Sequence, residues 1–405
     1  MNYKSGLIPV ILGGDLNAYS VALSFKESLD VNSHVFTRYK CGATEGSRFI
    51  TTHVSPDICD AKIALSELLS FKRDNSGSLL ILIPSNDQYL EIMYEIEDKI
   101  ADLYYYIIPR KEDYFKLTDK LFFYSVLDKF SIRHPKSYAV TKSNLEKIKD
   151  LNMEYPAVLK PTRSAEYNKI DFRKKKKVYF PTSHENATEI ATEIYNAGYS
   201  GRLVLQEKIS DKARLGVLTT LSGKDGRVIR ASLGKAVLLE RGDSSYGNYS
   251  AIITTPLDTV SLLIINMLNK LSYRGIANFD LMYLDGNAYC LELNARQGRS
   301  CDYLRGAGIS LAEYFLENTV LFGNGESDFS FNEIFWHYPS LRTAMENLED
   351  FSEYERILRL VKSGKSYTPF NNGFDGVKKR VYAIIHDLRQ RESFRRQRKL
   401  KNDTL

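Results

Sequence analysis

The first part of the chain alternates between short apolar runs and segments in which apolar residues recur with helical spacing. Residues 7–14 predict a buried strand, and residues 16–29 predict a helix. Residues 33–39 and 78–87 predict further strands, and residues 91–109 predict a helix followed by another strand. Such alternation is typical of an α/β layer built on a mainly parallel sheet.

The turn between the first strand and the first helix carries Gly13, Gly14 and Asp15. A glycine turn before a helix is able to cradle a phosphate or a dinucleotide. This turn lacks the full GxGxxG spacing and a clear acidic partner downstream. Two interpretations therefore stay open, a direct contact with a ligand and glycines that merely allow a tight turn.

Residues 274–294 predict a β-hairpin, because two strand-like runs flank the turn composition Asp-Gly-Asn at residues 285–287. With a three-residue loop, Leu284 pairs with Ala288. In that register Asp280 lies directly opposite Glu292, with Cβ atoms roughly 5 Å apart.

Alternation along the second strand of this hairpin places Glu292 and Asn294 on one face, and Leu291 and Leu293 on the other. Two facing carboxylates beside an amide repel unless a cation neutralises them. Mg²⁺ prefers such oxygen ligands. The alternative is an exposed sheet face with scattered polar residues.

Two arginines, Arg296 and Arg299, follow the hairpin at once, as a site that handles phosphate oxygens requires. Upstream, Lys120 lies in a segment with helical spacing, for which Thr118 is a candidate N-cap. A lysine in a first helical turn opposes the helix dipole, which indicates an anionic partner. Lys160 ends a short apolar strand forty residues later.

The order and spacing of these features over residues 116–320 resemble the ATP-grasp enzymes. The resemblance implies an ATP-grasp fold preceded by a Rossmann-like domain, with residues 203–210 leading into a hinge that holds adenine. It implies ATP and Mg²⁺ as cofactors, with Mn²⁺ as an alternative ion. The implied site comprises nucleotide-binding Lys120, Lys160, Glu207, Lys208, Ile209 and Asp211, metal-binding Asp280, Glu292 and Asn294, and catalytic Arg296 and Arg299.

Within that superfamily, residues 9–25, 160–180 and 234–256 are similar to segments of the D-aspartate ligases. This resemblance, over roughly residues 7–310, implies that ATP activates the side-chain carboxylate of D-aspartate. The acceptor amine would be a lysine side chain of a peptidoglycan precursor. One departure is the absence of glycine from residues 161–177, where the chain is basic instead. The run Arg173–Lys177 is either a solvated surface or a source of phosphate contacts.

Composition is consistent with a cytoplasmic enzyme. The four cysteines lack CxxC or zinc-ligand spacing, and no apolar run approaches a signal peptide or a membrane span. We expect a Rossmann-like domain over residues 1–115, an ATP-grasp domain over 116–325 hinged near 205–210, and a helical basic region over 326–405.

The last 31 residues carry the whole net charge of the chain. From Asp375 to Leu405 the net charge is +6, equal to that of all 405 residues. A basic helix with an apolar start has three interpretations: a solvated terminal helix, weak contact with a membrane surface or an anionic precursor, or nucleic-acid binding. Charge confined to one end argues against nucleic acid.

Two classes of function remain. The first is a carboxylate–amine ligase, acting on D-aspartate or on another amino acid or peptide. The second is a non-catalytic protein that binds a nucleotide or an anionic surface through its basic tail. The complete set Asp280, Glu292, Asn294 and Arg296 favours the ligase, since a vestigial site need not retain it.

Overall fold

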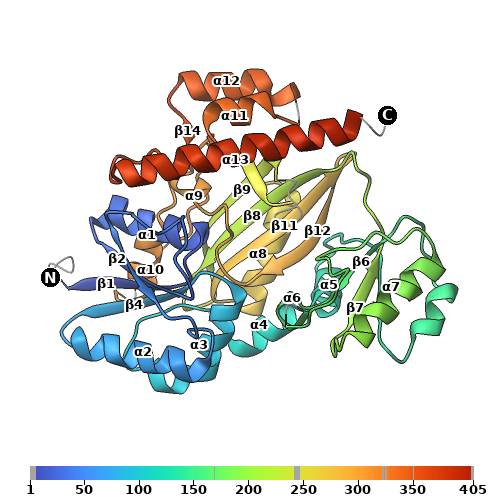
Figure 1. Cartoon of the computed structure of the whole chain (residues 1–405), viewed down its shortest axis with the longest axis horizontal. Helices are drawn as coiled ribbons and strands as arrows, with labels where there is room; N and C mark the ends of the chain where they lie inside the picture. Colours follow the sequence, from blue (N-terminus) through green and yellow to red (C-terminus); the bar gives the residue numbers. More distant parts are fainter. Residues whose placement is uncertain are drawn as a thin grey trace.

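The N-terminal part of the computed structural model is a parallel sheet in the order β3-β2-β1-β4, covered by three helices (Figure 1). The structure describes residues 6–167, 169–240, 247–321, 323, 326–349 and 351–402. The prediction of a parallel α/β layer is confirmed. Its elements are β1 (Leu7–Leu12), α1 (Leu16–Leu29), β2 (Ser33–Thr37), β3 (Ile50–Val54), α2 (Ala61–Asp74), β4 (Leu79–Pro84) and α3 (Asp87–Ile100).

Helix α2 was not predicted, and two details of the strands in this layer also differ from the sequence prediction. The edge strand β3 was not predicted, because its side chains are half-buried or exposed and form no apolar run. The strand predicted before Pro109 is only an isolated bridge, in which Tyr105 pairs with Ile81. Its backbone makes two hydrogen bonds to β4, through Leu80 and Leu82, and then leaves the sheet.

The largest sheet has seven strands in the order β12-β11-β8-β9-β10-β13-β14. All neighbours are antiparallel except β13 and β14. The last two strands come from the C-terminal region, which therefore contributes more than helices. The strands are β8 (Arg214–Ser222), β9 (Val228–Leu239), β10 (Tyr249–Thr255), β11 (Gly275–Leu284), β12 (Asn287–Asn294), β13 (Phe335–His337) and β14 (Ser366–Tyr367).

A third, smaller sheet has the order β5-β7-β6 and a core of its own, shared with helix α7. Helices α4 and α5 connect the N-terminal layer to it, and α5 and α8 pack in the apolar core beneath the large sheet. These elements are α4 (Lys111–Leu117), α5 (Lys120–Lys129), β5 (Ser137–Val140), the 3-10 helix Leu145–Asp150, β6 (Val158–Pro161), α6 (Ser164–Tyr167), α7 (His184–Asn196), β7 (Leu203–Gln206) and α8 (Thr259–Leu271).

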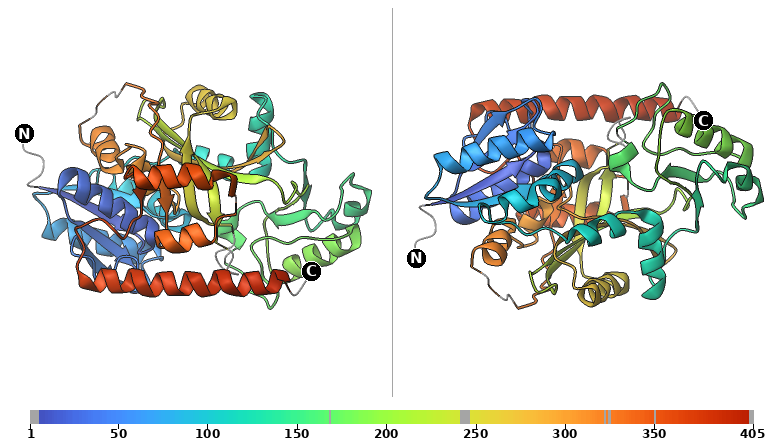
Figure 2. Two further views of the ribbon diagram at one scale, coloured as in Figure 1. Left: turned by 90° about the horizontal axis from the view of Figure 1, so that it is seen from above. Right: turned by 90° about the horizontal axis from the view of Figure 1, so that it is seen from below.

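The C-terminal helices lie over the N-terminal layer and the large sheet, and the longest, α13, runs along one side of the molecule toward the small sheet (Figure 2). None of the helices among the described residues is both long and apolar enough to cross a membrane. The C-terminal elements are α9 (Tyr303–Gly306), α10 (Leu311–Thr319), α11 (Leu341–Glu346), the 3-10 turn Phe351–Glu353, α12 (Tyr354–Lys362) and α13 (Val377–Asn402).

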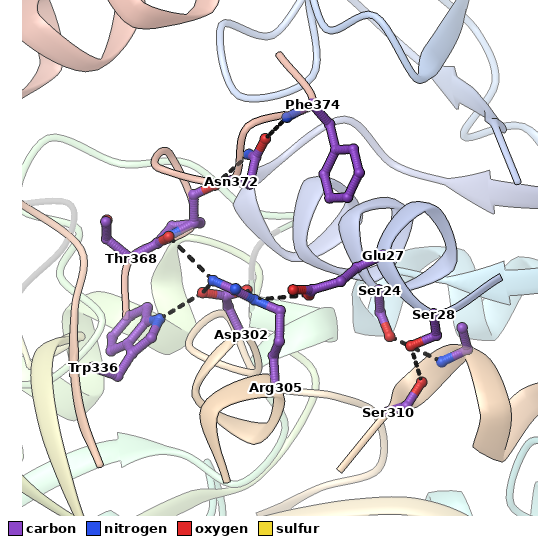
Figure 3. Close-up of polar contacts among 12 residues, drawn as sticks. Ser24, Glu27, Ser28, Asp302, Arg305, Ser310, Trp336, Thr368, Asn372 and Phe374 are labelled. Carbon is purple, nitrogen blue, oxygen red and sulfur yellow. Dashed lines mark hydrogen bonds and ion pairs between the residues drawn. The ribbon is translucent and has the colours of Figure 1, made fainter. Parts of the chain in front are cut away.

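A buried cluster around Asp302 joins three parts of the chain (Figure 3). Asp302 accepts from the Trp336 indole at 2.9 Å and pairs with Arg305 at 3.0 Å. Arg305 also lies 3.5 Å from Glu27 of α1 and donates to the Thr368 carbonyl. Because Asp302 is only 3% exposed, its bonds to Trp336 and Arg305 are shielded from water and link α9 to the C-terminal region, while the more exposed Glu27 adds a contact to α1.

Candidate active site

The hairpin of β11 and β12 has a tighter turn than predicted. Asp285 and Gly286 form a two-residue loop in which both have positive φ, 48° and 76°, as a type I′ turn requires. Leu284 consequently pairs with Asn287, so the predicted pairing of Leu284 with Ala288 is wrong.

A β-bulge at Leu291 then shifts the register by one residue and brings Asp280 opposite Glu292, as predicted. The bulge is stabilised by its neighbours, because the Leu291 carbonyl accepts from the Tyr124 hydroxyl at 2.8 Å. It also changes one predicted orientation. Leu293 is buried in the core, but Leu291 lines the cavity beside Glu292 instead of facing away from it.

Each carboxylate of this pair has a different partner. Asp280 accepts from the Tyr249 hydroxyl at 2.8 Å and from the Asn294 amide at 3.4 Å. Glu292 pairs with Lys120 at 2.9 Å. Lys120 is buried as well, so this ion pair is largely shielded from water.

The electrostatics follow these partners. Burial and the neighbouring Glu292 raise the pKa of Asp280. The opposite happens at Glu292, whose pKa is lowered chiefly by Lys120. Burial, together with Lys120, lowers the pKa of Lys160 to about 8. The two carboxylates on one side of the site repel each other, and so do Lys120 and Lys160 on the other side. A polyanion with a bound cation would relieve both repulsions.

Lys120 occupies the first turn of α5, as predicted, but the N-cap is Asp119 and not Thr118. The Asp119 carboxylate accepts from the backbone amide of Phe122, whereas the Thr118 hydroxyl donates back to Tyr114 at the end of α4. A carboxylate is the stronger cap because it also complements the helix dipole.

The lysines of the basic run Arg173–Lys177 have different surroundings. Lys177 lines the cavity. Lys174 instead lies 3.9 Å from Glu193 of α7, and Lys175 donates to the Ile170 carbonyl. One lysine of the run therefore lines the cavity while two of its neighbours have partners elsewhere.

The two arginines after the hairpin are held by carboxylates from other parts of the fold. Arg296 pairs with Asp87 at the start of α3, at 3.1 Å. Its Nε is buried and has no hydrogen-bond partner among the described residues, so a donor is left over for a ligand. Arg299 pairs with Glu240 at 2.7 Å and lies 5.0 Å over the Tyr338 ring.

One cavity of about 780 Å³ brings together the carboxylate pair, Lys120, Lys160 and Lys177, and both arginines, a volume within the usual range of ligand sites. All eleven residues predicted for the site line it: Lys120, Lys160, Glu207, Lys208, Ile209, Asp211, Asp280, Glu292, Asn294, Arg296 and Arg299. Sequence reasoning missed its apolar walls, which come from several strands and from the loop before α7, including Val158, Phe180, Leu215, Met282 and Leu291.

Residues 207–211, which the sequence predicts to belong to a hinge, form one edge of this cavity. The Glu207 side chain accepts from the backbone amide of Lys136 at 2.8 Å, and Lys208 pairs with Asp211 at 2.6 Å. The Glu207 backbone amide also donates to the Lys136 carbonyl, so the backbone and the side chain of Glu207 both have partners within the fold. The predicted contact of this segment with adenine stays a prediction.

The glycine turn packs tightly and also lies near the arginines. A Cβ at Gly13, which has a φ of 110°, would come within 1.9 Å of the Ser85 hydroxyl, so close packing alone requires glycine there. Asp15 caps α1 through the Ala18 amide. Burial raises the pKa of Asp15, and the Ala18 hydrogen bond and the charges of Arg296 and Arg299 oppose that rise.

The donor set fits a hard cation that shares its ligands with a nucleotide. Within the described ranges there is no group of three or more His, Cys, Asp and Glu side chains able to hold a metal ion alone. Asp280, Glu292 and Asn294 supply two carboxylates and an amide. That leaves coordination positions for phosphate oxygens, as is usual for Mg²⁺ at nucleotide sites.

The fold agrees with this chemistry. The biotin carboxylase domain of Hydrogenobacter thermophilus 2-oxoglutarate carboxylase, solved with MgADP, ADP and bicarbonate, matches with a TM-score of 0.60 and 14% identity, covering 81% of this chain and 73% of that one. Phosphoribosylamine–glycine ligase of Thermotoga maritima matches with a TM-score of 0.53 and 18% identity, covering 81% and 78%. These likenesses show that the chain has the ATP-grasp fold.

A curated relative is closer in sequence. The chain is 28% identical over 340 residues to the D-aspartate ligase of Enterococcus faecium (strain Aus0004), covering 79% of this chain and 80% of the relative. No protein-family model matches the chain. Residues 241–246, within the segment 234–256 that carries part of the resemblance, lie outside the described residues.

Proposed function

We propose that the chain uses ATP to join the side-chain carboxylate of D-aspartate to a lysine side-chain amine of a peptidoglycan precursor. The observation that carries the ligase chemistry is the single cavity in which lysines face paired carboxylates beside two arginines. The similarity to a D-aspartate ligase over 79% of the chain supports the choice of acyl donor.

The reaction proceeds in two steps. A carboxylate oxygen of the acyl donor attacks the γ-phosphorus of ATP, the bond to ADP breaks, and an acyl phosphate forms. The uncharged acceptor amine then attacks the acyl carbon, and inorganic phosphate leaves with the electron pair of the C–O bond. The first step is needed because a free carboxylate has no competent leaving group, and it requires alignment and neutralised charge more than a protein nucleophile.

The charged walls of the cavity supply that neutralisation. Lys120 and Lys160 would bind the phosphate oxygens of ATP, and Lys177 is placed to join them. Asp280, Glu292 and Asn294 would hold Mg²⁺, which when bound screens the phosphate charge. On binding, the nucleotide and its cation would replace the direct contact between Lys120 and Glu292.

The arginines would act on the acyl donor. Arg296 has a buried Nε without a partner and lies in the field of Asp280, next to the proposed metal position. It would stabilise charge on the transferring phosphoryl group and then on the tetrahedral intermediate. Arg299, held by Glu240, would bind the α-carboxylate of the amino acid as a planar fork.

The adenine base would lie against the apolar wall formed by Val158, Met282 and Leu291, beside the hinge segment. The bulge at Leu291 is what turns this side chain toward the cavity. Such a wall provides stacking area while backbone groups of the hinge provide hydrogen bonds.

Hydroxylamine trapping tests this function directly. The full-length protein is incubated with ATP, Mg²⁺ and hydroxylamine together with D-aspartate, L-aspartate or D-alanine. We expect a β-aspartyl hydroxamate and ADP with D-aspartate, and little with L-aspartate, because inversion at Cα leaves buried partners unpaired. A hydroxamate from a different amino acid would reassign the acyl donor, and no ADP with any carboxylate would refute the ligase.

A further inference from the structure

Helix α13 presents an apolar stripe to solvent along its outward face. Its members are Val377, Val381, Ile384, Ile385 and Leu388, which are 72%, 47%, 61%, 44% and 58% exposed. Their spacing of four, three, one and three residues places them on one side of a helix. Large apolar side chains gathered in this way mark an interaction surface, whereas single exposed ones do not.

Cations border and extend this stripe. Lys378, Arg380, Arg389, Arg395 and Arg396 are all exposed on α13, against one exposed carboxylate on the described part of the helix, Glu392. Arg396 pairs with Glu392 at 2.9 Å, so the rest of this border keeps a net positive charge. The stripe and this border are called the outward face below.

The opposite side of α13 is fixed to the protein, so the outward face is not an unpacked core surface. Lys379 donates to the carbonyls of Gly42 and Ala43 and lies 4.5 Å over the Tyr19 ring. Asp387 accepts from the Ser340 backbone amide at 2.8 Å.

Farther along, the same inner side reaches the core and the cavity wall. Phe394 is buried with the C-terminal core. Gln390 donates to Glu240, the partner of Arg299, at 3.3 Å. The helix therefore holds its outward face in one orientation while its inner side contacts the catalytic cavity.

We propose that the outward face of α13 docks the protein on the surface of a bilayer rich in anionic phospholipid. In this arrangement the apolar stripe enters the interface and the cations lie at the level of the phosphates, as in amphipathic helices that bind in the membrane plane. A second copy fits worse, because a two-fold contact through this face would bring the cations of one helix against those of the other. A polyanion alone leaves the apolar stripe exposed to water.

Docking would keep the cavity close to the membrane, where it would meet any membrane-bound form of the proposed precursor. This consequence depends on the proposed function, but the docking itself does not. The binding and the turnover are therefore measured separately.

Vesicle flotation of the full-length protein tests the docking. The vesicles are made of equal parts of phosphatidylglycerol and phosphatidylcholine, or of phosphatidylcholine alone. We expect binding to the anionic vesicles only, weakened by salt because surface charge attraction is screened. The double substitution Ile384→Glu and Leu388→Glu should lower the bound fraction by about tenfold or more, since each buried apolar side chain contributes strongly to partitioning.

The matched control is Leu262→Glu on α8, a side chain that is 54% exposed and lies on another helix. It should float like the unchanged protein. Arg389→Glu together with Arg395→Glu should reduce binding and its dependence on salt. Circular dichroism and the thermal midpoint check that each variant folds.

Three results would overturn the proposal. The first is that the unchanged protein does not float with anionic vesicles. The second is that the protein with the double substitution on the stripe floats equally well. The third is a dimer in sedimentation velocity that the stripe substitutions dissociate, without vesicle binding, which would make the face an interface between copies. ADP release with dissolved substrates should be unchanged in the stripe variants. Loss of flotation with retained turnover, or the reverse, therefore separates a failure of docking from a failure of the ligase function.

Discussion

The two ends of the cavity are held in different ways. At the nucleotide end, formed by Lys120, Lys160, Asp280 and Glu292, opposite charges contact each other across the space that a ligand would enter. At the arginine end, formed by Arg296 and Arg299, carboxylates outside the predicted site hold both guanidinium groups.

The two ends of the cavity are therefore arranged differently before a substrate binds. At the nucleotide end, ligand binding must break the buried ion pair between Lys120 and Glu292. The two charged side chains would then contact the ligand instead of each other. At the arginine end, Asp87 and Glu240 set the orientation of the guanidinium groups before any ligand arrives. Since Asp87 belongs to the N-terminal layer, that layer takes part in orienting Arg296.

The largest effect is expected from Glu292→Gln at the nucleotide end. Loss of this charge removes a proposed metal ligand and the partner of Lys120, so ADP release should fall by about 100-fold or more. Steady-state ADP release at saturating ATP measures it. Glu146→Gln, on an exposed 3-10 helix, is the matched control and should retain full activity. Near-normal turnover by Glu292→Gln would refute the metal assignment.

Lys160→Ala should weaken ATP binding without affecting the acyl donor. A charge-assisted phosphate contact contributes about 1.5–3 kcal/mol, so the Kd for ATP should rise by about ten- to 150-fold. Isothermal titration calorimetry with ATP and Mg²⁺ measures the change. Lys174→Ala serves as the control, because Lys174 lies toward Glu193. Equal affinities for the two variants would mean that Lys160 makes no phosphate contact.

A substitution at the arginine end, by contrast, should leave the affinity for ATP unchanged. Asp87→Asn removes the charge that holds Arg296, the side chain assigned to the transferring phosphoryl group, so kcat should fall by about fivefold while the Kd for ATP stays the same. Initial rates at varied D-aspartate, with ATP saturating, measure the effect. Asp98, on the same helix, pairs with its exposed neighbour Lys99, so Asp98→Asn should have no effect. A change in ATP affinity would show that the two ends are not independent.

The sequence predicted the nucleotide end better than the arginine end, for a physical reason. Alternation along a hairpin and a lysine at a helix start are local patterns, so Asp280, Glu292 and Lys120 could be predicted from their neighbours in the chain. The pairing of Asp280 with Glu292 was nevertheless reached through a wrong loop length, because a turn one residue shorter is offset by a bulge that no local pattern indicated.

The partners of the arginines depend on tertiary contacts. Arg296 and Asp87 are separated by 209 positions, and Arg299 and Glu240 by 59. Only the packing of the N-terminal layer and the large sheet brings them together. The strands β13 and β14 were missed for a similar reason, since they are three and two residues long and are strands only by pairing with the large sheet.

The smallest expected effect is the pH dependence of ATP affinity. The pKa of Lys160 is lowered to about 8 by burial and by Lys120, and phosphate oxygens bind its protonated form. ATP affinity should therefore be highest below this pKa and fall as the pH rises through it. Between pH 7 and pH 8.5 the protonated fraction falls by about fourfold, and the Kd should rise by the same factor.

Lys160→Arg separates this titration from other groups at the nucleotide end. A guanidinium group stays protonated over the whole range, so the Kd of this variant should stay nearly constant from pH 7 to pH 8.5. Calorimetry in two buffers of different ionisation enthalpy also counts the protons taken up on ATP binding. This number should increase near pH 8 in the unchanged protein and not in Lys160→Arg. A fourfold change that persists in Lys160→Arg would assign the titration to another group, whereas its loss would show that the nucleotide end selects the charged form of this buried lysine.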